Sequence, residues 1–183
     1  MTKKIIISLA VIAAIALGIL YARGLLSVHQ GLTPPPSLAA LKLERNPQAA
    51  PDVAFSDAAG KRMKLADFRG RFVLVNLWAT WCAPCVAELP ALSRLAAFAP
   101  GVRVLAINTD RGTVDAAAFL KSHKVALPVF RDSDVVMLKS FKAYGLPMTA
   151  LVDPQGKIVA RAEGPADWDS PEAVAYFKRI TGS

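Results

Sequence analysis

The stretch FVLVNLWATWCAPC, residues 72–85, decides the fold of this chain. Its first half, Phe72–Trp78, is a nearly continuous apolar run, which is typical of a strand buried on both faces of a sheet. A segment of helical composition, Cys85–Phe98, follows directly. Cys82 and Cys85 are the only cysteines of the chain, and they stand at the junction of strand and helix. This order predicts a redox-active C-x-x-C site.

The spacing of the two cysteines explains the chemistry that we expect from them. Residues i and i+3 of a helix share a face, so the sulfurs can meet as a disulfide or lie together as a dithiol. Free N–H groups and the positive end of the helix dipole favour thiolate over thiol, and the thiol pKa in such motifs falls from about 8.5 to roughly 3.5–7.5. We expect Cys82 to be the exposed attacking thiolate and Cys85 to be the resolving thiol.

Other uses of the cysteine pair remain open. A structural disulfide across three residues would close almost no loop and would add little stability. A Cu(I)-binding carrier that uses Cys82 and Cys85 is the non-enzymatic alternative. A zinc shell is not expected, because His29 falls in a predicted linker and His123 on another helix. We expect no metal, and no cofactor besides the redox-active Cys82–Cys85 disulfide.

Length and composition suggest one globular domain with an N-terminal extension. The chain has 183 residues, of which 54% are apolar and 20% are charged, so intrinsic disorder is excluded. We predict a membrane anchor over residues 1–26, a proline-containing linker over 27–46 and a single domain over 47–183. The linker holds the stiff spacer Pro34–Pro36, and Leu38–Leu43 is compatible with one or two helical turns.

The predicted anchor rests on an apolar segment without charges, Ile5–Ala22. As a helix it would span about 27 Å, close to the ~30 Å thickness of the hydrocarbon layer. A cleaved signal peptide is the alternative, although its apolar core is usually shorter. Lys3 and Lys4 favour a cytoplasmic N-terminus, which Arg23 opposes weakly. We therefore expect a single-pass anchor in the bacterial cytoplasmic membrane, with the domain in the periplasm.

The formal net charge of +8 does not indicate nucleic-acid binding. Five basic residues lie between Lys61 and Arg71, against the single acid Asp67. A nucleic-acid surface would also need interleaved aromatic side chains on the same face. We interpret the cluster as a solvated face, which is compatible with a position near anionic lipid.

The segment from Pro47 onward predicts a mixed α/β domain. Strands at Val53–Phe55 and Met63–Leu65 flank a turn signal and predict an N-terminal β-hairpin extension. The later predicted elements are the strands Phe72–Trp78, Val102–Asn108, Thr149–Asp153 and Lys157–Ala162, and the helices Cys85–Phe98, Thr113–Lys124, Asp134–Tyr144 and Pro171–Ile180. This order predicts a central mixed sheet flanked by helices.

Two longer stretches carry a family resemblance. FVLVNLWATWCAPCVAELPAL and YGLPMTALVDPQGKIV resemble thioredoxin-fold proteins of the membrane-anchored TlpA-like/ResA-like family. The similarity extends from Pro51 to Thr181, and the GLP and GPADWDSPEA stretches are most similar to the TlpA branch. The resemblance implies a thioredoxin fold over residues 47–183. It also implies a thiol–disulfide oxidoreductase, usually a reductant, tethered to the bacterial cytoplasmic membrane.

The resemblance also implies a substrate groove beside the cysteines. Pro147 matches the family's cis-proline, which faces the C-x-x-C motif and lies where an extended substrate segment pairs with the backbone. Trp81 is expected in the exposed apolar rim, with a core tryptophan as the alternative. Met148 is expected to serve packing rather than copper ligation. The expected groove residues are Trp81, Ala83, Pro84, Leu146, Pro147 and Met148.

Glu88 is the candidate proton carrier. A helical glutamate taken alone is usually a solvated surface residue, but the resemblance implies an acid near the thiols at this position. Many thioredoxins have a buried aspartate in the strand before the motif, where this chain has Asn76, which cannot titrate and which we interpret as structural. Disulfide reduction requires the resolving thiol to lose a proton and the leaving thiolate to gain one. Our hypothesis is that Glu88 tunes the pKa of the cysteines and shuttles these protons.

The resemblance implies a membrane electron donor that receives its electrons from cytoplasmic thioredoxin. It is compatible with two classes of substrate. One role reduces cysteine pairs of a copper chaperone and of the copper-binding oxidase subunit, and the other reduces apocytochrome c. Met148 favours the copper-linked role, because cytochrome c maturation relatives typically have an acid after the cis-proline. The dipeptide between the cysteines lacks the histidine of strongly oxidising relatives, which favours a reductant. We expect a monomer.

A peroxiredoxin shares the fold, but its P-x-x-x-T-x-x-C pattern is not met. That pattern would need proline at position 75 and threonine at position 79. The chain has Val75 and Ala79 there. We therefore do not expect peroxiredoxin chemistry at Cys82.

Overall fold

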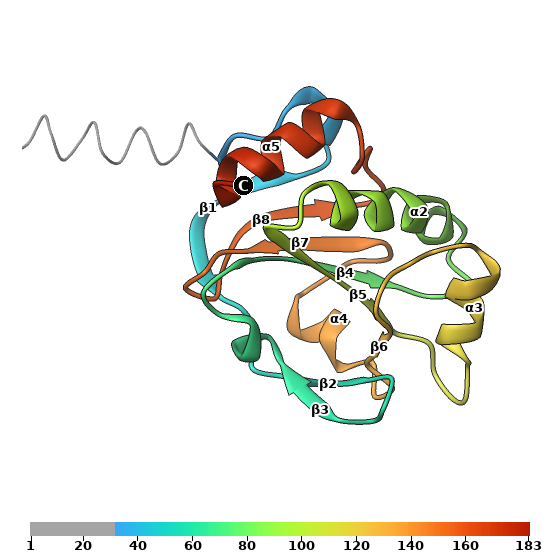
Figure 1. Cartoon of the computed structure of the whole chain (residues 1–183). Helices are drawn as coiled ribbons and strands as arrows, with labels where there is room; N and C mark the ends of the chain where they lie inside the picture. Colours follow the sequence, from blue (N-terminus) through green and yellow to red (C-terminus); the bar gives the residue numbers. More distant parts are fainter. Residues whose placement is uncertain (1–31) are drawn as a thin grey trace, which may run out of the picture. The chain divides into compact units, whose positions relative to one another are not determined.

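An eight-stranded mixed sheet in the order β1-β8-β7-β4-β5-β6-β2-β3 forms the centre of the fold (Figure 1). The computed structural model describes residues 32–183, and the contacts below lie within the compact unit Pro34–Ser183. The predicted anchor over residues 1–26 lies outside the described residues. Within residues 32–183, no helix is both long and apolar enough to cross a membrane.

The strand predicted from the opening stretch lies in the middle of this sheet. β4 (Phe72–Trp78) pairs in parallel with β5 (Val102–Asn108) and antiparallel with β7 (Met148–Val152). Every residue of β4 after Phe72 is buried. Helices cover both faces of the sheet, which is why the strand needs apolar side chains on both sides.

The sheet separates two layers of core side chains, each of which packs against helices. α2 (Ala83–Phe98) and α5 (Pro171–Thr181) lie above the sheet in Figure 1, and α4 (Val136–Ser140) lies below it. The upper layer contains Leu74, Leu92 and Tyr176, and the lower layer contains Val75, Phe130 and Phe141. Alternate residues of β4 therefore belong to different layers, as the period of a strand requires.

The N-terminal edge of the sheet differs from the prediction. A single 3-10 turn, η1 (Pro36–Leu38), precedes the edge strand β1 (Lys42–Ala49), which pairs antiparallel with β8 (Lys157–Glu163). The predicted linker over 27–46 and the predicted boundary at residue 47 therefore overlap a strand. β1 is mostly exposed, rich in charged residues and contains Pro47, all of which are common in edge strands. Its sequence has no alternation of apolar and polar residues that would have indicated a strand.

A β-hairpin forms the opposite edge of the sheet. β2 (Ala54–Asp57) and β3 (Arg62–Lys64) pair antiparallel, and β2 also pairs with β6 (Phe130–Arg131). Oδ1 of Asp57 accepts hydrogen bonds from the N–H groups of Ala59 and Lys61, both at 2.9 Å, and closes the turn. The 3-10 turn η2 (Leu65–Phe68) follows β3.

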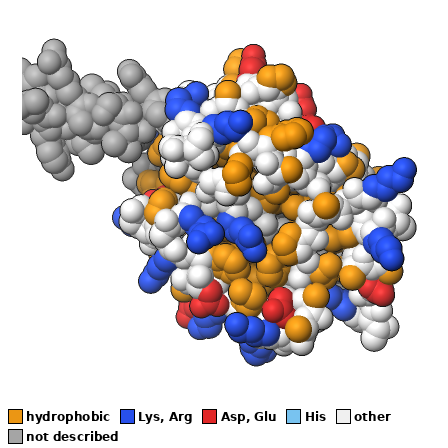
Figure 2. Space-filling model, in the orientation of Figure 1, with side chains coloured by type: hydrophobic (Ala, Val, Ile, Leu, Met, Phe, Trp, Pro, Cys, Tyr) orange, Lys and Arg blue, Asp and Glu red, His pale blue; other side chains and the backbone are white. Residues whose placement is uncertain are grey.

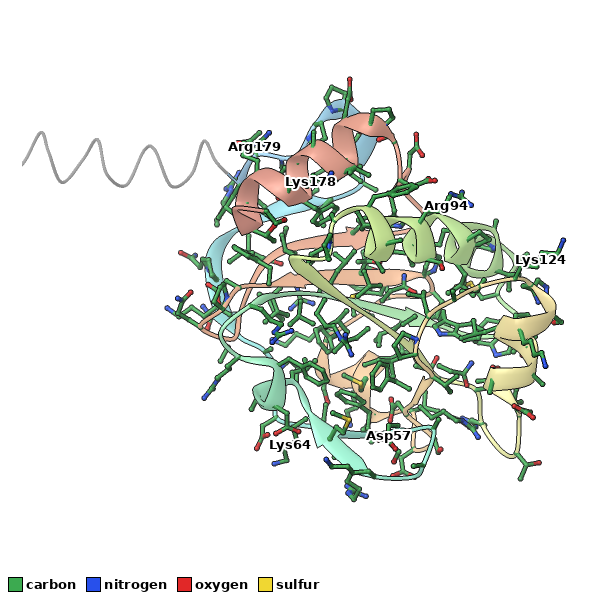
Figure 3. All side chains as sticks on the ribbon, in the orientation of Figure 1. Asp57, Lys64, Arg94, Lys124, Lys178 and Arg179 are labelled. Atoms are coloured by element: carbon green, nitrogen blue, oxygen red, sulfur yellow. A yellow bond between two sulfur atoms is a disulfide. The ribbon has the colours of Figure 1, made fainter. Side chains whose placement is uncertain are left out.

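The basic cluster between Lys61 and Arg71 lies around this hairpin. Lys64 forms an ion pair with Asp52 at 3.0 Å, and its backbone N–H donates to Asp67. Lys64 and Asp57 lie across the sheet from Arg94 of α2 (Figure 3). On the face shown in Figure 2, Lys and Arg side chains are spread around an apolar centre with acidic side chains between them.

Two of the predicted helices are shorter than expected. α3 spans Ala116–Ser122 instead of the predicted Thr113–Lys124. Its N-cap is Asp115, whose carboxylate accepts from the N–H of Ala118 at 2.9 Å. α4 has only five residues, because Val135 before it and Lys142 after it have φ of 54°, which a helix cannot continue through.

Candidate active site

The two cysteines form a disulfide at the N-terminus of α2. Cys82 is the N-cap residue, and its Sγ accepts a hydrogen bond from the backbone N–H of Cys85 at 3.3 Å. The Cα atoms of the pair are 5.3 Å apart. Pro84 lies in the first turn, where its missing N–H leaves no helical hydrogen bond unmade. The site predicted from the sequence is therefore assembled in the described structure.

The exposure of the cysteines differs in degree from the expectation. Cys82 was expected to be exposed, yet the residue is only 4% exposed, while Cys85 is fully buried. The side chain of Cys82 folds back onto the first turn of α2, where it meets both the N–H and the sulfur of Cys85. Cys82 remains the more accessible residue of the pair, which is compatible with the attacking role expected for it.

A buried aspartate holds the turn before Cys82. Oδ2 of Asp110 accepts from the backbone N–H of Thr80 at 2.9 Å and from Nδ2 of Asn108 at 2.7 Å. The N–H of Cys82 in turn donates to the carbonyl oxygen of Ala79 at 3.1 Å. Asp110 is 2% exposed and forms no ion pair with any described residue. Its position fixes the backbone that presents Cys82.

Asp110 was missed in the sequence, although a signal was present. Asn108 ends β5 and Asp110 follows two residues later. The carboxyl ends of the parallel strands β4 and β5 lie at the same edge of the sheet. Polar residues directly after β5 therefore had to lie close to the C-x-x-C turn that follows β4.

Trp81 forms an exposed apolar rim beside Cys82. It is 73% exposed, so the alternative of a core tryptophan is wrong. Trp78 fills that role instead, with its ring centroid 5.7 Å from that of Phe119. Trp81 borders an open surface hollow whose other lining residues are Thr80, Val114, Asp115, Ala118, Phe119 and Ser122. This hollow is a surface on which an apolar substrate side chain can lie.

The Leu146–Pro147 peptide bond is cis, as the resemblance implied. Met148 begins β7 and is fully buried in the lower layer of the core, so only its backbone can border a groove. The carbonyl oxygen of Pro147 accepts from the N–H of Gly164 at 2.9 Å. Within residues 32–183, no hydrogen bond occupies the backbone of Leu146. Leu146 is therefore the residue that can pair with an incoming strand.

Glu88 is a buried carboxylate rather than a surface residue. It is 4% exposed and lies one helical turn after Cys85 on α2. Nδ2 of Asn76 donates to its Oε1 at 2.8 Å, and Nε1 of Trp168 donates to its Oε2 at 2.8 Å. Burial raises the pKa of Glu88 above its ordinary value, and the hydrogen bonds from Trp168, Asn76 and the Ala166 backbone oppose this rise.

The described residues contain no group of three or more His, Cys, Asp or Glu side chains placed to hold a metal ion. Of the two histidines, His29 lies outside the described residues. The ring of His123 stacks on Phe119 at the surface, with centroids 4.2 Å apart.

A disulfide at a helix N-terminus, beside an apolar rim, a cis-proline and a buried acid, defines a thioredoxin-fold site for thiol–disulfide exchange. Residues 47–161 match the model of the AhpC/TSA family. The chain belongs to this family and, within it, to the ResA-like thiol–disulfide oxidoreductases, as the following comparisons show.

The relatives in this group are bacterial proteins named thiol-disulfide oxidoreductase ResA. The protein from Bacillus subtilis is 35% identical over 117 residues, which cover 63% of this chain and 65% of the relative. The protein from Bacillus thuringiensis is 31% identical over 134 residues, which cover 72% of this chain and 76% of the relative.

Solved structures give the same picture of the fold. The thioredoxin domain of a thiol-disulfide oxidoreductase from Bacteroides vulgatus has a TM-score of 0.63 at 27% identity and covers 73% of this chain and 96% of that chain. A thiol:disulfide interchange protein from Bacteroides sp. has a TM-score of 0.61 at 28% identity and covers 75% and 91%, respectively.

Proposed function

We propose that this protein is a membrane-anchored, periplasmic oxidoreductase that reduces cysteine pairs of other proteins. The observation that carries the proposal is the Cys82–Cys85 disulfide at the N-cap of α2, one turn from the buried Glu88. The ResA names of its relatives and the Ala-Pro dipeptide between the cysteines support the direction. The anchor over residues 1–26 and the periplasmic location are part of this proposal.

The reaction proceeds by two exchanges. In the reduced protein, the Cys82 thiolate attacks one sulfur of a substrate disulfide, which forms a mixed disulfide and releases the first substrate thiolate. The Cys85 thiolate then attacks Sγ of Cys82, which forms the Cys82–Cys85 disulfide and releases the second substrate thiolate. Two electrons have passed to the substrate. A membrane electron donor returns two electrons to the Cys82–Cys85 pair in each cycle.

The site supplies the groups that each step requires. The N–H of Cys85 and the positive end of α2 stabilise the Cys82 thiolate. Glu88 accepts the proton of the Cys85 thiol and returns it to a leaving thiolate. The carboxyl group is suited to both steps because burial raises its pKa toward neutral pH. The unoccupied backbone of Leu146 pairs with the substrate segment by strand addition, while Trp81 packs against that segment.

The substrates that we propose are a copper chaperone and the copper-binding subunit of cytochrome oxidase. Met148 is buried among apolar side chains, so a carboxylate at this position would be costly. Because Met148 follows Pro147, the site lacks the acid that is typical after the cis-proline of cytochrome c maturation relatives. Apocytochrome c is the competing substrate, and a Cu(I) carrier is the competing function. The protein acts as a monomer.

The reduction potential of the cysteine pair tests the direction of electron flow. We expect a value within the range of thioredoxin and the glutaredoxins, roughly −270 to −200 mV, from equilibration with glutathione. Trp81 adjoins Cys82 and reports the state by fluorescence. A value near −120 mV, about that of a strong disulfide donor, would reverse the proposed electron flow. The Cys82→Ser variant controls for fluorescence changes unrelated to the pair.

Competition between oxidised substrates tests the substrate class. The reduced protein is mixed with equal amounts of an oxidised copper chaperone and oxidised apocytochrome c, and the thiols of each are counted by mass. Faster reduction of the chaperone is expected. Faster reduction of apocytochrome c would move the proposal to cytochrome c maturation. Tight Cu(I) binding by the reduced protein, without reduction of either substrate, would instead identify a carrier.

A further inference from the structure

The loop between β8 and α5 brings a tryptophan into the interior beside Glu88. Trp168 is fully buried, and its Nε1 lies 2.8 Å from Oε2 of Glu88. The backbone N–H of Ala166, in the same loop, donates to the same oxygen at 3.3 Å. The two partners are 80 residues apart in the chain. The loop therefore contributes directly to the surroundings of the active-site acid.

The two oxygens of Glu88 have unequal surroundings. A carboxylate oxygen has two lone pairs that accept hydrogen bonds. Oε2 has two donors, from Trp168 and Ala166, whereas Oε1 has one donor, from Asn76. Oε1 is therefore the oxygen with a free lone pair, and a proton taken up by Glu88 has its place there.

The surroundings of Oε1 contain a further polar atom. Oδ1 of Asn76 is buried and has no hydrogen-bond partner among the described residues. Nδ2 of the same amide donates both to Oε1 of Glu88 and to Oγ1 of Thr149, at 2.8 and 2.9 Å. Asn76 therefore has, besides the donor that Oε1 uses, an acceptor that no described residue uses.

No described cation compensates the charge of Glu88. The groups bonded to its carboxylate are the amide of Asn76, the indole of Trp168 and the N–H of Ala166, all of them neutral. Within the same loop, Asp169 forms an ion pair with Arg94 at the surface of α2, and Arg94 points outward in Figure 3. Asp167 takes part in no ion pair of the described residues. Cys85 lies on the preceding turn of α2, and in the proposed function its thiol is the group whose proton Glu88 accepts.

We propose that Trp168 is a positioning residue for proton transfer at the Cys82–Cys85 pair: its indole N–H occupies Oε2 of Glu88 and leaves Oε1 to exchange the proton. The inference rests on the proposed function of Glu88 in thiol–disulfide exchange. In the resolving step, the proton leaves Sγ of Cys85 and binds Oε1, and the thiolate electron pair forms the bond to Sγ of Cys82. The displaced substrate thiolate receives a proton in return.

The test compares two buried tryptophans in the full chain. Trp168→Phe removes an N–H that bonds to Glu88, whereas Trp78→Phe removes an N–H with no hydrogen-bond partner among the described residues. Both rings are at most 1% exposed, so the two variants lose similar packing. The readout is the rate of substrate-disulfide reduction against pH, together with the pKa of Glu88 from carbon NMR of labelled glutamate.

Trp168→Phe is expected to raise the pKa of Glu88 by about one to two units, because a hydrogen bond to a charged acceptor is lost. The pH–rate profile is expected to move upward by the same amount, while that of Trp78→Phe stays where it is in the parent. A parent-like profile in folded Trp168→Phe would overturn the inference. Should Trp168→Phe fail to fold, 3-benzothienylalanine at position 168 keeps the ring size without the N–H, and the same two outcomes apply.

A Glu88→Gln variant separates the two proposals. If Glu88→Gln changes the profile and Trp168→Phe does not, only the role of Trp168 is wrong. If Glu88→Gln keeps the parent profile, the role of Glu88 is wrong, and the inference about Trp168 is overturned with it. The inference also expects that adding Trp168→Phe to Glu88→Gln changes the pH profile no further, since no carboxylate remains to be positioned.

Discussion

Asn76 and Glu88 form a buried hydrogen bond of 2.8 Å that joins the central strand β4 to the helix carrying the cysteines. The strand position is filled by an amide that cannot titrate, and the helix position by an acid that can. The amide contributes a donor to the acid, so Asn76 holds the carboxylate of Glu88 in place.

Glu88→Gln should slow disulfide reduction on the order of 100-fold near neutral pH, because general acid–base catalysis contributes about that much. Stopped-flow fluorescence with an oxidised protein substrate measures the rate. The control is Glu172→Gln, which removes a carboxylate from the exposed first turn of α5. Equal rates for Glu88→Gln and the parent at every pH would remove Glu88 from the mechanism.

Glu88 should also make folding stability depend on pH. Its folded pKa is raised above the ordinary value of 4.5, so its ionisation opposes folding. Its contribution is fully present below about pH 4.5 and is lost as the pH rises through the folded pKa. Relative to the parent, Glu88→Gln should therefore gain unfolding free energy as the pH rises from 4 to 8. Urea unfolding at several pH values measures this gain, and a constant difference would contradict the raised pKa.

The two cysteines should behave differently when replaced by serine. Cys85→Ser should accumulate mixed disulfides with substrate proteins, because in the proposed reaction the fully buried Cys85 is the group that resolves them. Cys82→Ser should accumulate none, because the attacking sulfur is absent. Non-reducing electrophoresis followed by mass spectrometry identifies the adducts. Adducts formed through Cys85 in the Cys82→Ser variant would reverse the assignment.

Asp110→Ala should impair the site through the Thr80 turn. It leaves the N–H of Thr80 and the amide of Asn108 without their acceptor, at a cost of about 1–3 kcal/mol in stability. The thiol pKa of Cys82 should also change, because its backbone is no longer held. Asp132→Ala is the matched control, since Asp132 is equally buried but caps α4. The idea is wrong if both variants alter the pKa of Cys82 alike.

Trp81→Ala should weaken exchange with proteins without affecting the fold. The residue is largely exposed, so the free energy of unfolding should change by less than about 0.5 kcal/mol. Loss of an aromatic contact should lower the rate with protein substrates about tenfold, while the rate with glutathione disulfide should stay constant. Comparable losses with both substrates would point to chemistry at Cys82 rather than recognition.

Truncation should reveal where the domain begins. A chain that starts at Pro47 lacks residues 42–46 of β1. It also lacks the buried Leu38 and Leu41, each of which contributes about 2 kcal/mol by burial. It should be several kcal/mol less stable than a chain that starts at Pro34, measured by urea unfolding. Equal stability of the two chains would show that β1 adds nothing to the domain.

Local patterns in the sequence predicted the centre of this molecule. The apolar run of β4, the C-x-x-C spacing and the helix that begins at Pro171 are signals within a few residues, and the structure confirms each of them. The cis bond before Pro147 followed from a family resemblance, because the intrinsic preference of a proline for cis is low.

Residues that meet only through the fold could not be predicted from local periodicity. Trp168 reaches Glu88 from 80 residues away, and Asp110 reaches Thr80 from 30 residues away, so no local periodicity indicates either contact. β1 escaped prediction for another reason. Its stability comes from hydrogen bonds to β8 and not from an apolar face, so its sequence resembles that of a linker.

The disulfide joins residues only three positions apart, within the first turn of α2. Its formation therefore restricts the unfolded chain very little. By thermodynamic linkage, the melting temperatures of the oxidised and reduced forms then differ only as far as the folded site prefers one redox state over the other. Melting curves of the oxidised and the reduced form therefore measure the redox preference of the folded site without glutathione. The difference between the two melting temperatures ranks variants of the site by how strongly they favour the disulfide or the dithiol.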